Sequence, residues 1–401
     1  TSLVSSRRTG ERSPGTRPST SAAVVGGLFF PRSAELRLRV EATVSLRVER
    51  KLVYAGVCAE SFGSASAHLK HLADLDISSE RIRRATRRVG ADRVRQREQV
   101  VREFLAKPLP EQSTGSPAGT PAPAMACVMA DGGRYQLLDR QQPSTPGEHW
   151  KESRVATFLE LEPVTHEVDP TPELPDFLRS VSIAKRLAEI GRVQGKNSQV
   201  SQRPEKQGSK EPPWPRPKIL KKTMEASAVC WEEFGPIMAA HAWHAGFHAA
   251  AAKVFVSDGS SAIEKVHRQH FSHYVSVLDL MHALSYALAA ARASTTNDDD
   301  SWRLYVQWAE WIWQGKVDRV ISSLEELQQR LGDPPVEAAA DDPREVVRRA
   351  HVYYTNHQTR MNYPEYRRRG FPLTSAVMES SVKQINQRVK GTEKFWSGGG
   401  A

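Results

Sequence analysis

Two aspartates stand at positions where carboxylates can bind metal ions. Asp131 directly follows the apolar run CVMA, Asp258 directly follows the apolar run VFVS, and a glycine comes after each aspartate. The sequence predicts a buried strand that emerges into a glycine-containing turn at both places. Two carboxylates at converging strand ends repel each other unless a cation neutralises them, and Mg²⁺ prefers such hard oxygen ligands. Taken alone, each Asp-Gly pair is also ordinary turn chemistry.

A third acid, Glu379, lies in the segment LTSAVMESSVKQINQRVK, where apolar residues recur at helical spacing. Thr374 or Ser375 is suited to cap this helix, which we expect to project Glu379 onto the same sheet edge. Three carboxylates can hold two divalent ions about 3.5 to 4 Å apart, an arrangement that promotes in-line phosphoryl transfer. The alternative interpretation is a solvated glutamate on an amphipathic helix.

The elements around these acids alternate between strands and helices. β-prone runs bounded by turn residues are predicted as strands, at 125–130, 135–138, 155–161, 218–223, 253–257 and 275–278. Helical periodicity predicts an Ala/His-rich helix at 232–252 and a mostly helical block at 282–329. This alternation predicts an α/β fold class, with a mixed sheet flanked by helices.

The composition favours a nucleic-acid partner. The 401 residues include 56 Lys and Arg against 46 Asp and Glu, which gives a formal net charge of +10. Such an excess is expected of a protein that binds phosphate groups. The three cysteines are far apart and odd in number, which fits a reducing compartment. No apolar run approaches the roughly 20 residues of a membrane helix, so we expect no membrane partner.

Residues 61–89 have the pattern of a helix, a short turn and a capped second helix. Ile82, Ala85 and Val89 would face the core of this helix-turn-helix-like unit. The arginines left for phosphates or base edges are then Arg81, Arg83, Arg84, Arg87 and Arg88. A solvated basic helix without a DNA partner is the alternative interpretation.

Five segments in order carry a family likeness. They are MADGGRYQ at 129–136, HWKESRV at 149–155, FVSDGSSAIEKVHRQHF at 255–271, VLDLMHAL at 277–284, and RMNYPEYRRRGFPLTSAVMESSVKQINQRVKGTEKFW at 360–396. Together they resemble insertion-sequence transposases of the ISKra family, relatives of the Mutator-like group. The likeness covers most of the chain from about Phe29 onward, and the last segment is the most specific.

The resemblance implies a ribonuclease-H-like catalytic core with an Asp-Asp-Glu triad. Motif by motif, the triad falls on Asp131, Asp258 and Glu379. Related transposases also carry a Cys/Asp-x-x-His element, which Asp279 and His282 match here. His282 would then lie near the scissile phosphate as an electrostatic or acid-base helper. The alternative interpretation is a helix-capping aspartate and a structural histidine.

The resemblance also implies cofactors, partners and location. It implies two Mg²⁺ ions per site, with Mn²⁺ as a substitute, and DNA as the partner, both at terminal inverted repeats and at the target. We expect Arg388 and Lys390, after Glu379, to contact DNA as well. Two element ends need two active sites, so we expect a homo-oligomer on DNA. The expected location is the bacterial cytoplasm, in association with the nucleoid.

Shifts in composition predict the organisation of the chain. The predicted segments are a disordered arm at 1–30, a helical DNA-binding unit at 31–109, a linker at 110–124, a catalytic core at 125–281 with a mobile insertion at 194–217, a helical insertion at 282–358, and the Glu379 helix with a truncated C-terminus at 359–401. The truncation is an expectation from FWSGGGA, where family members continue with a further helical tail.

Several alternatives stay open from sequence. An inactive transposase derivative that only binds DNA would fit the truncation, and a metal hydrolase of small phosphoesters would fit the acids. His241, His244 and His248 have a spacing that can gather zinc, but packing or surface roles are the favoured interpretation. Four tryptophans between 302 and 313 favour an amphipathic core face over stacking on flipped bases.

Overall fold

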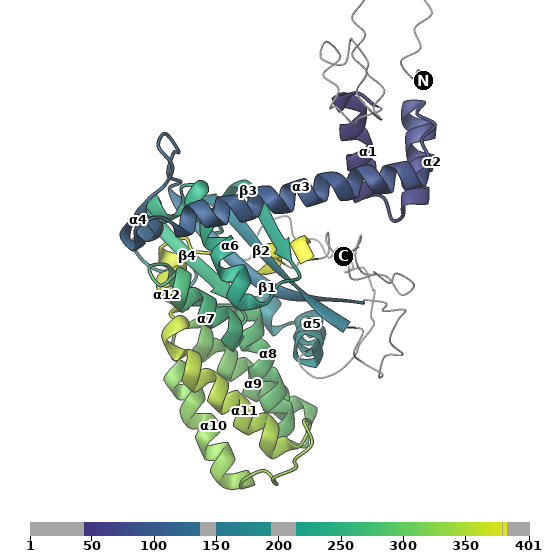
Figure 1. Cartoon of the computed structure of the whole chain (residues 1–401). Helices are drawn as coiled ribbons and strands as arrows, with labels where there is room; N and C mark the ends of the chain where they lie inside the picture. Colours follow the sequence, from purple (N-terminus) through teal and green to yellow (C-terminus); the bar gives the residue numbers. More distant parts are fainter. Residues whose placement is uncertain (1–43, 137–149, 194–213, 379, 383–401) are drawn as a thin grey trace, which may run out of the picture. The chain divides into compact units, whose positions relative to one another are not determined.

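The structure is a computed structural model that describes residues 44–136, 150–193, 214–378 and 380–382 (Figure 1). The described chain forms two compact units, and the boundary between Arg97 and Glu98 lies inside the long helix α3 (Ser79–Leu105). The sequence predicted a boundary at the 110–124 linker. That prediction was wrong for 110–114, which belong to helix α4 (Leu109–Thr114), because a proline in the first turn is compatible with a helix.

The first unit contains α1 (Leu46–Cys58), α2 (Phe62–Ala73) and the beginning of α3. Serine side chains cap α1 and α2, and Asp74 ends α2 in a left-handed conformation. Ile82 and Ala85 are buried in the core of this unit, as predicted, together with Leu52 and Leu69. The predicted order of helix, turn and helix is therefore confirmed, although α3 continues well beyond residue 89.

The second unit contains a five-stranded sheet in the order β3-β2-β1-β4-β5. The strands are β1 (Met125–Gln136), β2 (Trp150–Glu162), β3 (Lys218–Ser227), β4 (Ala252–Ser257) and β5 (Val275–Leu278). The first three form an antiparallel meander, and β4 and β5 run parallel to β1. The predicted mixed α/β sheet is confirmed.

One strand differs from its prediction. The sequence predicted a break at Asp131-Gly132-Gly133, but β1 continues through all three residues because β2 pairs with each of them. Gly132 lies within this pairing, opposite Arg154 of β2. Asp131 is thus inside a strand rather than at its end. Parallel pairing of β1 with β4, however, stops at Met129.

Alternate residues of the strands supply two cores, one on each face of the sheet. Ala126, Val128 and Ala130 face the core formed with α6 (Trp231–His244) and α7 (Ser261–His270). Cys127 and Met129 face the opposite core, formed with α5 (Val181–Val193) and α8 (Leu280–Ser294). Asp131 continues the second series and therefore belongs to the α8 face.

Helices α9 (Asp298–Trp313) and α11 (Pro343–His357) pack beside α8, and α10 (Val317–Leu331) packs against α9 and α11 (Figure 1). The short α12 (Tyr363–Arg368) follows. Short 3-10 helices lie at Asp176–Arg179, Phe247–Ala249 and Gln358–Arg360. Trp308 and Trp313 are fully buried, so the predicted core face is confirmed.

Two predicted boundaries fall elsewhere. The helix predicted at 232–252 ends at His244, because Gly246 takes a left-handed conformation with φ 74° and turns the chain. The boundary predicted between 281 and 282 falls inside α8. Residues 194–213 of the predicted insertion, and the predicted arm at 1–30, lie outside the described residues. Trp214, the first described residue after that gap, is buried against Trp313.

Candidate functional site

The register of the parallel strands brings three aspartates to one edge of the sheet. Met129 of β1 is level with Val256 of β4, so Asp131 and Asp258, each two residues further on, are level as well. Ser257 of β4 pairs with Leu278 of β5, which makes Asp279 level with Asp258. The peptide N–H of Asp279 also donates to the Ser257 carbonyl at 2.8 Å. The predicted convergence of Asp131 and Asp258 is a consequence of this register.

Asp131 and Asp258 form a pair of like charges without a nearby Lys or Arg. Within the described ranges, neither carboxylate makes an ion pair with a basic side chain at 4 Å or less. Oδ1 of Asp131 accepts from the Gly132 N–H at 2.7 Å, and Oδ1 of Asp258 accepts from the Ser260 N–H at 2.8 Å. Burial raises the pKa of Asp131 to about 7, and repulsion from Asp258 adds to the rise.

Asp279 and His282 form an ion pair at the first turn of α8. Asp279 is buried and caps the helix, because its Oδ1 accepts from the His282 N–H at 3.0 Å. Nδ1 of His282 lies 3.3 Å from the same oxygen. Burial alone would lower the pKa of His282, but Asp279, followed by Asp258 and Asp131, raises it to about 9. The imidazole is therefore charged at neutral pH and lies within the field of all three aspartates.

Burial alone would raise the pKa of Asp279, yet His282 and the N–H of Ser375 lower it to about 2. Ser375 donates to Oδ2 of Asp279, and the Leu280 N–H donates to the Leu373 carbonyl at 2.9 Å. The capping interpretation of Asp279 is thus correct. The same side chain also anchors the segment that leads to Glu379.

Glu379 itself lies outside the described residues, but its neighbours are described. Residues 376–378 and 380–382 are helical. On β2, Thr157 donates to Sδ of Met378 at 3.1 Å and to Oγ of Ser381 at 2.9 Å. Thr157 is the register partner of Met129 on β1. Met129 lies two residues before Asp131, so the two side chains are on the same face of the sheet. The residues on both sides of Glu379 therefore pack on the face of the sheet that carries Asp131.

The predicted DNA-binding arginines of α3 are mostly held by acids of their own unit. Arg83 makes two hydrogen bonds of 2.7 Å with Glu80, and Arg84 lies 3.4 Å from the same carboxylate. Arg88 pairs with the buried Glu49. Arg84, Arg87 and Arg88 are nonetheless exposed, so the contact of these arginines with DNA stays a prediction. Arg388 and Lys390 lie outside the described residues.

The three histidines that could suggest zinc have separate partners. His241 contacts Thr223 at 2.9 Å and Glu225 at 3.1 Å, and His244 contacts the Ala240 carbonyl at 2.9 Å. His248 is buried, 3.1 Å from both His273 and the Tyr274 hydroxyl. His241 is half-buried and His244 is exposed, so the three side chains have packing or surface positions, which is the interpretation that the sequence favoured.

Sequence reasoning missed residues that adjoin Asp258. The Tyr353 hydroxyl donates to the Asp258 carbonyl at 2.9 Å, and Arg360 donates to Oγ of Ser257 at 2.6 Å. Arg360 is 7% exposed. It opens the most specific segment of the family likeness, and that position was the one available signal. Tyr353 belongs to an amphipathic helix, where nothing in the sequence separates it from ordinary core residues.

No protein-family model matches the chain, and no curated protein is similar to it. The likeness to ISKra-family transposases therefore stays a prediction. Among the described residues, no three His, Cys, Asp or Glu side chains are grouped closely enough to hold a metal ion, and Glu379 is not part of that set. The described helices include none with the length and apolar character required to cross a membrane.

Proposed function

We propose that the protein is a DNA transposase that cuts and joins DNA strands at the edge formed by Asp131 and Asp258. The single observation that carries this proposal is the juxtaposition of the two carboxylates. The register of the parallel strands β1 and β4 places Asp131 and Asp258 at the same level of the sheet. The mixed sheet is compatible with the ribonuclease-H-like core that the family resemblance implies. Glu379 would complete the triad, and the contacts of Met378 and Ser381 with Thr157 support that role.

The donor set fits a hard divalent cation. Asp131 and Asp258 are oxygen ligands, both are at least partly buried, and neither is neutralised by a Lys or Arg of the described chain. A buried pair of like charges costs free energy, and a bound cation removes that cost. Mg²⁺, held by Asp131, Asp258 and Glu379, would supply Lewis-acid activation of the attacking and leaving oxygens.

Side chains of the protein would position the DNA and stabilise the charge on the phosphate. The two aspartates fix the edge at which the scissile phosphodiester lies. His282 carries a positive charge because Asp279 holds it, so it can donate a hydrogen bond to a phosphate oxygen. Water attacks the phosphorus and the P–O3′ bond breaks, which leaves a 5′-phosphate and a free 3′-hydroxyl. This hydroxyl then attacks a phosphodiester of the target strand, bonds to its phosphorus and displaces a 3′-hydroxyl of the target. Asp279 acts through His282 and is a positioning residue.

The test is strand cleavage by the full chain. The substrate is a supercoiled plasmid that carries the DNA flanking the coding region, with Mg²⁺ or Mn²⁺ present. We expect nicking that EDTA abolishes and that is lost in Asp131→Asn, Asp258→Asn and Glu379→Gln. Asp318→Asn removes an exposed acid from α10 and serves as the matched control. Undiminished nicking in all three site variants would overturn the proposal, and DNA binding without any nicking by the unaltered chain would identify a DNA-binding derivative instead.

A further inference from the structure

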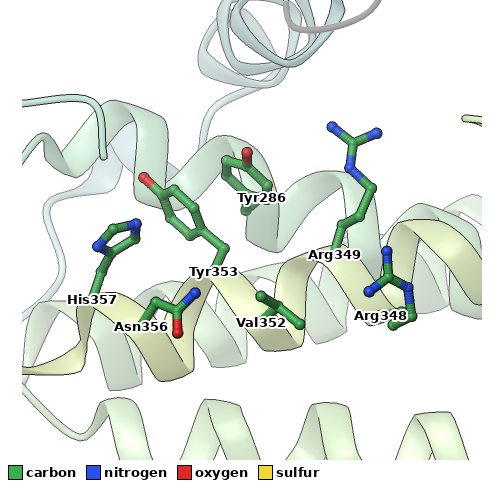
Figure 2. A pocket seen from close by; sticks show the side chains of 7 residues that line it. All are labelled: Tyr286, Arg348, Arg349, Val352, Tyr353, Asn356 and His357. Atoms are coloured by element: carbon green, nitrogen blue, oxygen red, sulfur yellow. The ribbon is translucent and has the colours of Figure 1, made fainter. Parts of the chain in front are cut away.

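A pocket of about 210 Å³ opens between α8 and α11 (Figure 2). Tyr286 of α8 lines it, together with Arg348, Arg349, Tyr353 and His357 of α11. Its volume is below the range of about 300 to 1,000 Å³ that is usual for sites enclosing a whole small molecule. The pocket therefore suits one planar group of a larger ligand, the rest of which stays outside.

The pocket adjoins the sheet edge that carries Asp131 and Asp258, which we call the carboxylate edge. Tyr353, which lines it, donates its hydroxyl proton to the Asp258 carbonyl at 2.9 Å. Tyr286 follows His282 by four residues on α8, so the two side chains are neighbours on one helix face. At Gly259, where φ is +93°, a Cβ atom would lie 3.0 Å from both Nε2 of His357 and Cε2 of Tyr353. A ligand strand at Asp258 is thus within a side chain's length of the pocket.

Two aromatic rings form a fixed wall of the pocket. Tyr286 and Tyr353 are stacked, with centroids 3.8 Å apart and an angle of 12° between the rings. Tyr353 is 8% exposed, whereas Tyr286 is half-buried and keeps part of its ring open to the pocket. Because the buried ring holds the open ring in place, the wall is preorganised for stacking against a planar group.

Positive charge accompanies the rings. Glu345 neutralises Arg348 through two hydrogen bonds of 2.7 and 2.8 Å. For the half-buried Arg349, the described residues supply no ion pair at 4 Å or less. Behind the pocket, Arg360 lies 3.3 Å from Nδ1 of His357 and has no carboxylate partner in the described part of the chain, and its Nε has no hydrogen-bond partner there.

A buried guanidinium without a counterion is unfavourable, so this corner of the unit favours an anion. His357 cannot neutralise the Arg360 guanidinium, because an imidazole carries no negative charge. Burial and the adjacent Arg360 lower the pKa of His357, which leaves a neutral imidazole. Arg349 is the cation that can reach a ligand, because it lines the pocket and its side chain extends beside Tyr286 in Figure 2.

We propose that this pocket binds one unpaired nucleotide of the DNA strand at the carboxylate edge, with the base against Tyr286 and the phosphate on Arg349. The inference rests on the proposed function for the identity of the strand. Stacking on an aromatic ring accepts any base, and a guanidinium binds phosphate through charge-assisted hydrogen bonds, so the site recognises single-stranded DNA without sequence preference. Taking a base out of a duplex costs a few kcal/mol, and DNA that is already unpaired avoids this cost.

The test measures binding by the full chain in EDTA, using fluorescence anisotropy. Three probes share one labelled duplex: a blunt form, a form with an oligothymidine tail, and a form with an abasic tail of equal length. We expect the thymidine tail to increase affinity about 5-fold to 150-fold over the blunt duplex, the range of one stacked base. The abasic tail, which keeps only the phosphates, should give a smaller gain.

Variants assign the two parts of the site. Tyr286→Ala should reduce the thymidine-tail preference to that of the abasic tail, whereas Tyr286→Phe, which keeps the ring, should retain it. Arg349→Ala should weaken both tails, and Arg319→Ala, which removes an exposed arginine from α10, should weaken neither. Equal binding of tailed and blunt probes by the unaltered chain, or a preference that survives in both alanine variants, overturns the inference.

The assay separates this inference from the proposed function. Tail preference without metal-dependent nicking would remove the enzyme proposal and leave the nucleotide pocket. Nicking without tail preference would do the reverse. Circular dichroism of each variant identifies one that has failed to fold, and Tyr286→Phe then decides for the ring, because it leaves the stacked pair in place.

Discussion

The carboxylate edge and the basic helix α3 hold charge in opposite ways. At the edge, Asp131 and Asp258 are brought together although they repel each other, and burial raises the pKa of Asp131. On α3, Arg83 and Arg84 are solvent-exposed in part and share Glu80 one turn away. Exposed pairs of the second kind contribute little to folding. Buried like charges are unfavourable, so they do not contribute to stability, and their presence supports the proposal of a cation site.

The largest effect should follow from removing that repulsion. The folded-state pKa of Asp131 is about 7 against an ordinary value of 3.8. The folded protein therefore keeps a proton that the unfolded chain loses, and metal-free stability should fall as pH rises from about 4 to about 7. The full penalty above that range is on the order of 4 kcal/mol. Asp131→Asn should remove this pH dependence and stabilise the protein above neutral pH, as measured by urea unfolding in EDTA.

The control for this prediction is Glu80→Gln on α3. Its carboxylate is exposed and its pKa is lowered by the hydrogen bond from Arg83, so the change should leave the profile above about pH 5 unaltered. Identical pH profiles for the unaltered protein and Asp131→Asn would show that the pKa of the Asp131 carboxyl is not raised in the folded protein. Mg²⁺ should raise the stability of the unaltered protein and not that of Asp131→Asn.

The next effect concerns a buried charge that is paired. Asp279 caps α8, pairs with His282 and accepts from the Ser375 N–H. Asp279→Ala removes all three interactions and should destabilise the protein by about 3 kcal/mol. Asp279→Asn can still cap the helix and should lose less. Equal losses for both variants in urea unfolding would mean that the charge, not the cap, carries the stabilisation.

How far the sequence could predict these regions depends on the range of the interactions. Apolar runs before Asp131 and Asp258 predicted both strands, since a short continuous apolar run is a local pattern that is typical of a strand buried on both faces. The common edge required the register of β1 on β4, which depends on packing between distant segments. The same limit explains the break wrongly predicted in β1. The Asp-Gly-Gly sequence favours a turn locally, but pairing with β2 extends the strand through it.

On the basic helix, the arginine spacing predicted side chains available to phosphate, and no contact in the structure tests that prediction. The spacing did not predict the hydrogen bonds of Arg83 with Glu80, although Glu80 is one turn away in the same sequence. Arg88 pairs with Glu49 of α1, and only the tertiary structure shows this contact. The pocket beside Asp258 was likewise out of reach, because Tyr286 and Tyr353 come together from helices that are far apart in the chain.

A smaller effect is expected within the first unit. Glu49 is 5% exposed and Arg88 is its ion-pair partner, so Arg88→Ala leaves a buried carboxylate without a partner. We expect a loss of about 1 to 2 kcal/mol in the free energy of unfolding. Arg88→Lys keeps the charge and should recover part of that loss. A neutral effect of Arg88→Ala would show that water or another basic group takes over the role of the guanidinium.

The smallest effect on stability, and the sharpest test of α3 as a DNA-binding helix, is expected from Arg84→Ala. Glu80 keeps two hydrogen bonds with Arg83, so the loss of Arg84 at 3.4 Å should leave urea unfolding unchanged. If Arg84 contacts phosphate, the slope of log affinity against log salt concentration should decrease in magnitude by about 1. Arg319→Ala on α10 is the control for a general loss of charge. An unchanged slope would make Arg84 a solvated residue, so that exposed charge on this helix would indicate neither stability nor a partner.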